Sequence, residues 1–287
     1  MAKRSTRTTL VDEDGNLINA ANPLDVVTGP PGGLEVVQPT HDDLNCNANI
    51  QYEDADVTTE RPLPVDPGFV LDAFGRQRIT QPLTVFDSKQ IFDNQPRFWD
   101  ETEGLLDFTS THSVLTASTV ISYDAGATGG TFTRQSFMRF NYQPGKSQLI
   151  MMTGILRKSG SPLAQIGYFD DDNGLFFETN TEDVTGVVLR SGVSGSTVDT
   201  RVVQANWNLD VMDGSGVSGI TLDWSKTQIF VIDFEWLGVG TARMGVFAHG
   251  EIHYVHQFRN ANVLDVVYMS TPNLPCRYQL TAGAFEA

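Results

Sequence analysis

From residue 69 onward, the chain alternates short runs of β-branched and aromatic residues with clusters of Gly, Asn, Asp and Pro. No segment keeps the period of about 3.6 residues that marks an amphipathic helix. The clearest pattern lies in residues 227–237, where Phe230, Ile232, Phe234 and Trp236 occupy alternate positions. A period of two predicts a strand with one buried face.

A hairpin is predicted at Asn173-Gly174, because an apolar run ending at Phe169 and an apolar return from Leu175 flank this turn dipeptide. The C-terminal part predicts an antiparallel meander with strands near 227–237, 242–248, 252–259, 263–269 and 276–281. Two packed sheets bury many half-apolar strands, and a closed barrel is the less favoured alternative. The prediction is an all-β body, an antiparallel β-sandwich resembling a jelly roll, over residues 71–287.

Residues 1–70 follow another pattern, with 12 acidic and four basic residues in a chain of net charge −16. Recurring Pro and Gly forbid long helices, and the only aromatic residue before Phe69 is Tyr52. Short β-prone runs interrupt this part, and such runs can pair with a strand edge of another subunit. We predict an extended attachment arm that orders on assembly, with a solvated linker as the alternative. The candidate assembly residues are Pro23, Leu24, Val26, Val27, Leu34, Val36, Val37, Leu63 and Val65.

Residues 71–100 are predicted to form the junction between arm and body, because Phe and Arg become frequent there. We expect Arg76 and Arg78 to pair with carboxylates, and Phe74 and Phe86 to anchor apolar surface. An alternative is that this basic and aromatic stretch holds a glycan or a neighbouring subunit.

Composition excludes several classes of protein. The longest apolar run, residues 149–156, is far shorter than the roughly 20 residues that span a bilayer. The acidic balance argues against nucleic-acid binding. The start of the chain lacks the apolar core of a secretory signal, so synthesis in a cytoplasm is expected. Cys46 and Cys276 are the only cysteines, and we expect two free thiols.

The acidic run of residues 169–174 suggests a calcium loop. With Gly174 at the sixth position of an EF-hand loop, Phe169 stands where the first carboxylate belongs and Asn180 where the bidentate Glu belongs. The motif fails, and a polar hairpin tip is the simpler interpretation.

Residues 249–256, "HGEIHYVH", lack the His-Glu-x-x-His spacing of zinc proteases. On a strand, His253 and His256 would point to opposite faces. We therefore expect cross-strand or partly buried histidines, and neither a metal nor a cofactor.

Asp233 and Glu235 share one face of a predicted strand, about 7 Å apart by strand geometry. Two such carboxylates could act on a sugar. In the related pattern of sandwich-fold glycosidases a Glu leads, and here Val231 occupies its place. We expect a solvated face or carboxylates paired with Arg, and no enzyme.

Five blocks in order resemble a family of virion structural proteins of tailed phages, common in aquatic phages. They are "DAFGRQRITQPLTVFDSKQ" (72–90), "MRFNYQPGKSQLIMMTG" (138–154), "IGYFDDDNGLFFE" (166–178), "FEWLGVGTARMGVF" (234–247) and "VVYMSTPNLPCRYQL" (266–280). The resemblance implies a tail-fibre, baseplate-peripheral or head-decorating component that is made in the host cytoplasm and located on the virion. It further implies other virion proteins as partners and a homotrimer, while the composition argues against nucleic acid and membrane insertion.

Two other functions are compatible with the sequence. A carbohydrate-binding module for the host surface would stack sugars on Trp207, Trp224 and Trp236. A glycan-cleaving enzyme would need Asp233 and Glu235 in a cleft.

Overall fold

The computed structural model consists of two units, Met1–Pro67 and Gly68–Ala287. It describes residues 51–52, 55–56, 71–78, 83–103, 108–123, 130–156, 162–180, 182 and 184–282. In the first unit, the described residues form one antiparallel pair, β1 (Gln51–Tyr52) with β2 (Ala55–Asp56). The second unit holds all the other described strands.

The larger sheet of the second unit has seven antiparallel strands in the order β11-β10-β9-β8-β15-β6-β3. Their bounds are β3 Trp99–Glu103, β6 Gly130–Ser136, β8 Leu163–Phe169, β9 Gly174–Thr179, β10 Thr185–Ser191, β11 Val198–Val203 and β15 Cys276–Ala282. Strands β8 to β11 form a meander, and β15 lies between β8 and β6.

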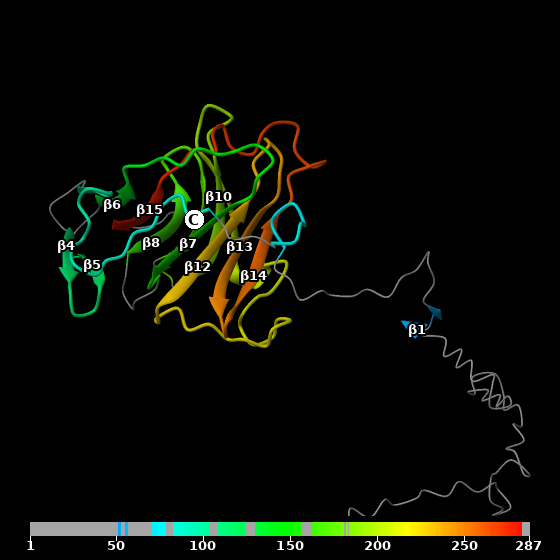
Figure 1. The fold of residues 1–287 in the computed structure, drawn as a ribbon, viewed down its shortest axis with the longest axis horizontal. Helices are drawn as coiled ribbons and strands as arrows, with labels where there is room; N and C mark the ends of the chain where they lie inside the picture. Colours follow the sequence, from blue (N-terminus) through cyan, green and yellow to red (C-terminus); the bar gives the residue numbers. More distant parts are fainter. Residues whose placement is uncertain are drawn as a thin grey trace, which may run out of the picture. The chain divides into compact units, whose positions relative to one another are not determined.

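The smaller sheet has four antiparallel strands in the order β14-β13-β12-β7. Their bounds are β7 Gln148–Gly154, β12 Gln228–Phe234, β13 Ala242–Ala248 and β14 Glu251–Phe258. A separate hairpin of β4 (Phe108–Ser113) and β5 (Ser118–Tyr123) lies beside β6 (Figure 1).

The main core lies between the two sheets. Phe230, Ile232 and Phe234 of β12 pack in one buried cluster with Phe177 of β9 and Tyr168 of β8. The alternating apolar residues of the predicted strand therefore form the inner face of β12. The prediction of an all-β antiparallel β-sandwich is confirmed.

The predicted hairpin at Asn173-Gly174 is confirmed as the β8–β9 connection, in which Phe169 pairs with Gly174. Gly174 has φ +153°, and a Cβ there would lie 2.0 Å from the Cβ of Phe169. Only glycine fits so close to the facing strand. The Asn173 side chain donates to Ser270 Oγ and accepts from the Ser270 amide, which ties the hairpin to a distant loop.

One strand prediction for the C-terminal part, residues 263–269, is wrong, and so is the extent of the predicted meander. Residues 263–269 form turns and bends, with Val263 and Leu264 donating backbone hydrogen bonds to Asn260. The segment carries the chain between the two sheets, so its β-branched residues do not enter a ladder. The meander accordingly ends at β14, and β15 joins the other sheet. Long-range pairing of this kind leaves no local sequence signal.

The described part of the chain contains one short 3₁₀ turn, η1 (Gln204–Asn206). No helix among the described residues is long and apolar enough to cross a membrane. Cys276 is buried without a disulfide partner, and Cys46 lies outside the described residues.

Candidate functional site

The outer face of the four-stranded sheet holds a fully buried carboxylate, Asp233. The Nη2 atom of Arg78 lies 2.7 Å from its Oδ1, and Arg243 pairs with its Oδ2. The hydroxyls of Ser147 and Tyr254 donate hydrogen bonds to the two carboxylate oxygens. Because a buried carboxylate needs partners of this kind, the cluster fixes the positions of all five side chains.

The junction segment 71–78 docks on this cluster. Arg243 donates to the Leu71 carbonyl at 2.6 Å, and the Ala73 amide donates to Ser147 Oγ at 3.4 Å. A bridge between Leu71 and Gln77 closes the segment into a loop. The start of the second unit is therefore attached to the sheet by both ends of this loop.

Within the loop, Arg76 pairs with Asp72 at 2.7 Å and stacks over the Phe74 ring, with its Cζ 4.5 Å from the ring centroid. Burial alone would raise the pKa of Asp72, but hydrogen bonds from Arg76 and Phe74 hold that pKa below its ordinary value. The carboxylate stays charged and caps the loop through its own backbone amides.

Burial shifts the pKa of one group in the cluster, Tyr254, and of one beside it, Glu235. Burial, with the negative charge of Asp233, raises the pKa of Tyr254, so its hydroxyl keeps the proton that it donates. Burial also raises the pKa of Glu235, whose Oε1 accepts from the Thr241 amide at 3.2 Å. Its Oε2 is buried without a hydrogen-bond partner among the described residues.

The structure thus pairs Arg76 and Arg78 with carboxylates. Phe86 lies elsewhere, in contact with the rings of Phe98, Trp99 and Phe140 at 5.2 to 6.0 Å between centroids. The four junction residues therefore occupy two places, and only three of them belong to the docked loop. Their role as interface residues stays a prediction.

The assembly residues predicted in the arm lie outside the described residues, and their role stays a prediction. They are Pro23, Leu24, Val26, Val27, Leu34, Val36, Val37, Leu63 and Val65.

Asp233 and Glu235 do not form a hydrolytic pair in this arrangement. Asp233 is shielded from solvent by two guanidinium groups, and neither side chain lines the groove along β14 or the small cavity at the end of β6. The alternative that the sequence left open, carboxylates paired with Arg, applies to Asp233. Arg78 is the partner that sequence reasoning missed, because 155 positions separate the two residues.

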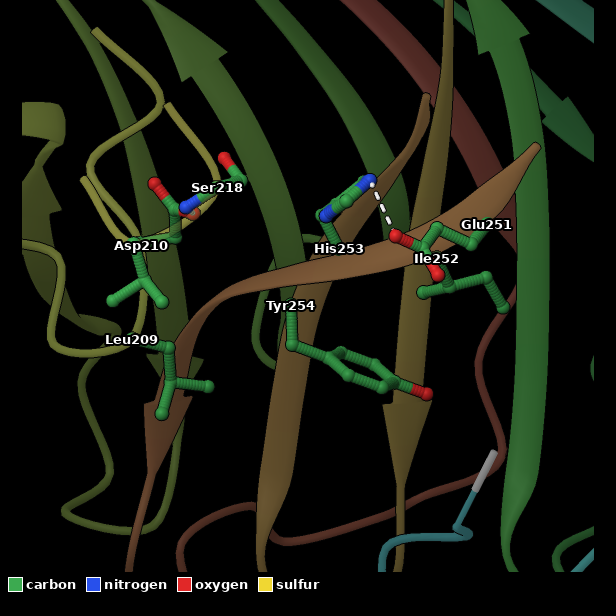
Figure 2. A pocket seen from close by; sticks show the side chains of 8 residues that line it. Leu209, Asp210, Ser218, Glu251, Ile252, His253 and Tyr254 are labelled. Carbon is green, nitrogen blue, oxygen red and sulfur yellow. Dashed lines mark hydrogen bonds and ion pairs between the residues drawn. The ribbon is translucent and has the colours of Figure 1, made fainter. Parts of the chain in front are cut away.

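The groove along the first half of β14 has a volume of about 360 Å³ (Figure 2). Asp210 and Ser218 line it from the loop that faces the strand, and Glu251 and His253 line it from β14. Asp210 already accepts hydrogen bonds from the Met212 and Ser218 amides. Burial alone would raise the pKa of Asp210, but these hydrogen bonds hold that pKa below its ordinary value.

The expected opposite orientation of the two β14 histidines is wrong. His253 pairs with Val246 and His256 with Met244, both core residues, because a β-bulge shifts the register between these pairs. The extra residue returns His256 to the inner face. No group of three or more His, Cys, Asp or Glu side chains in the described part of the chain is placed to hold a metal ion.

Two carboxylates of the acidic hairpin tip form ion pairs with arginines. Asp170 pairs with Arg139 at 2.6 Å and accepts the amides of Asp172 and Asn173. Asp171 pairs with Arg277. These contacts are those of a polar hairpin tip.

The proposed sugar platform of tryptophans is wrong. Trp207 and Trp224 are buried in the core, 5% and 6% exposed, with their rings 6.1 Å apart in an edge-to-face contact. Trp236 packs against the same core and donates to the Met269 carbonyl. With two rings buried and the third partly buried, the three do not form an exposed platform.

No protein-family model matches the chain, and no curated protein matches it in sequence. Two solved structures are similar at a low level. A legume lectin-like domain from Entamoeba histolytica has 9% identity and a TM-score of 0.36, over 71% of this chain and 90% of that one. A Bacillus licheniformis beta-glucanase has 11% identity and a TM-score of 0.36, over 67% and 82%.

Proposed function

We propose that this chain is a non-catalytic structural component of a tailed-phage particle. A β-sandwich body is attached to other virion proteins through residues 1–70, and the protein acts as a homotrimer. The five sequence blocks that resemble virion proteins support the particle role.

The observation that carries the attachment role is the docking of segment 71–78 through the buried Arg78–Asp233–Arg243 cluster. The peptide chain joins the arm to the body in any case, and the docked loop additionally fixes where the chain leaves the sheet. Release of the loop breaks the Arg78 pair while Asp233 keeps Arg243, which costs about 2 kcal/mol. The root of the arm therefore resists detachment more strongly than a surface contact would.

The test compares the full chain with a version that lacks residues 1–70 but keeps the docked loop. Light scattering should give three copies of the 31.5 kDa chain for the full protein. Incorporation is then measured in particles assembled without the native copy. We expect the shortened body to keep its fold and fail to incorporate. Normal incorporation of the shortened body would instead place the attachment surface on the body.

An Arg78→Met variant of the full chain tests the anchor separately. It keeps the arm and removes one charge that holds the loop. We expect reduced retention on particles, while an Arg201→Met variant, which removes an ion pair on the other sheet, should be retained normally. Equal retention of both variants would contradict the anchoring role.

A further inference from the structure

The outer face of the seven-stranded sheet carries two adjacent cross-strand pairs at its β3 edge. Phe98 and Phe137 face each other just beyond the ladder, joined by a 2.9 Å hydrogen bond from the Phe137 amide to the Phe98 carbonyl. Asp100 pairs with Gln135 two residues further along the two strands. Alternate residues of a strand share a face, so an aromatic pair lies beside a polar pair.

Both aromatic rings of this edge are open to solvent, with Phe98 48% and Phe137 61% exposed. β3 pairs with β6 on one side and is the last strand of the sheet on the other. Two adjoining exposed rings form a small apolar patch at this edge, and covering it would remove apolar surface from water.

A small cavity of about 100 Å³ opens beside the Phe137 ring, lined also by Asp100, Gln135, Arg139 and Pro275. The Asp100 carboxylate makes no hydrogen bond or ion pair with any residue in the described part of the chain. Gln135 accepts from Arg277 through Oε1, which leaves its amide N–H groups to donate. The cavity thus offers one acceptor and one donor within reach of an aromatic face.

We propose that this edge binds a neutral sugar, stacked on Phe137, with Asp100 and Gln135 holding its hydroxyls. Hydroxyl groups need both donors and acceptors, and the apolar face of a sugar ring stacks on an aromatic ring. The cavity is well below the 300 Å³ or more of drug-sized ligand sites, so it admits part of one sugar residue, whose ring face lies on Phe137. This site does not depend on the attachment role of the arm.

Charge sets the class of sugar. Asp170 neutralises Arg139 at the rim, and Asp100 then leaves the cavity negative. A uronic or sialic acid would meet like charge, so neutral sugars and N-acetyl sugars are the ligands.

The test is saturation-transfer NMR on the full chain with methyl glycosides of glucose, galactose and N-acetylglucosamine, and with methyl glucuronide. Saturation transfer to at least one neutral glycoside is expected, with perturbed amide resonances at Asp100, Gln135 and Phe137. Transfer to none of the neutral glycosides, or perturbations confined to other residues, would overturn the proposal.

Matched variants locate the site. Asp100→Asn and Phe137→Ala should each weaken binding about tenfold or more, because each removes a direct contact with the sugar. Phe92→Ala is the control, since Phe92 is 84% exposed and does not line the cavity. Equal weakening by Phe92→Ala would overturn the assignment. Binding of L-arginine methyl ester in place of sugars would also overturn it, in favour of a basic side chain of a protein partner.

Discussion

The outer faces of the two sheets handle buried charge in opposite ways. On the four-stranded sheet, one carboxylate, Asp233, holds two guanidinium groups and a loop from another part of the chain. On the seven-stranded sheet, polar side chains form a ladder of successive pairs with no single central group. The ladder includes Arg277, Gln279, Gln165, Glu178 and Arg201.

This contrast indicates that the outer face of the four-stranded sheet anchors a loop, whereas the outer face of the seven-stranded sheet is an ordinary polar surface. In the ladder, Gln279 contacts Arg277 and Gln165, so a change there breaks two hydrogen bonds, while both neighbours keep other partners. A cluster around one buried carboxylate loses every contact at once. Substitutions on the two faces should therefore differ in cost and in how far the damage spreads.

Asp233→Ala should give the largest difference in stability between the two faces. It leaves Arg78 and Arg243 partly buried without their common counterion, and we expect a loss of about 3–5 kcal/mol in the free energy of unfolding. Urea unfolding measures it, with Glu178→Ala on the ladder as the matched acidic control. If the two variants lost equal stability, the contrast between anchor and surface would be wrong.

Acid should weaken the smaller sheet through His256. Burial lowers the pKa of His256 to about 4 from 6.5, and its ring contacts Phe258 and accepts the Asn208 amide. The unfolded chain binds the proton first, so stability is lost as pH falls from about 6.5 to 4, by at most about 3 kcal/mol. Urea unfolding at both pH values should show a smaller loss for His256→Asn than for the wild type. An identical loss would exclude His256 as the source.

Arg78→Met separates the loop from the rest of the anchor, because it loosens the loop alone. Asp233 keeps Arg243, so we expect a moderate cost of about 2 kcal/mol. Hydrogen exchange should accelerate at the amides of Asp72 and Gly75, which bond within the loop. Unchanged exchange at these amides would show that Arg78 does not hold the loop.

The smallest effect is expected on the ladder itself. Gln279→Ala removes the hydrogen bond from Nε2 to Gln165 Oε1 at 3.0 Å and the one that Oε1 accepts from Arg277 at 3.3 Å. We expect about 0.5–1 kcal/mol, because the remaining partners stay hydrogen-bonded. Thermal unfolding followed by circular dichroism measures it, and a loss above that of Arg78→Met would show that the ladder is the more sensitive face.

Local pattern predicted much of the fold. The alternation in residues 227–237 predicted the inner face of β12, and Asn173-Gly174 predicted the β8–β9 hairpin. Both signals lie within a few residues of one another, where strand period and turn chemistry act directly. The extra residue of the β14 bulge has no such signal, and it reversed the expected side of His256.

The candidate sites depend on contacts between residues far apart in the sequence, and local pattern does not reveal such contacts. That Asp233 would meet an arginine was foreseeable from chemistry, but the identity of Arg78 follows only from the docking of the loop. The exposed edge with Phe137 was missed because "QSFMRF" reads as an ordinary strand end. The tryptophans were misjudged because aromatic content alone does not distinguish a core from a platform.

The position of β15 also bears on how the protein is made. This strand, Cys276–Ala282, separates β8 from β6 in the middle of the larger sheet. Until the ribosome has released it, β3 and β6 cannot join β8 to β11, and both halves expose unpaired strand edges. The larger sheet therefore cannot be completed before β15 has been made, and until then the acidic character of the chain opposes association between nascent chains.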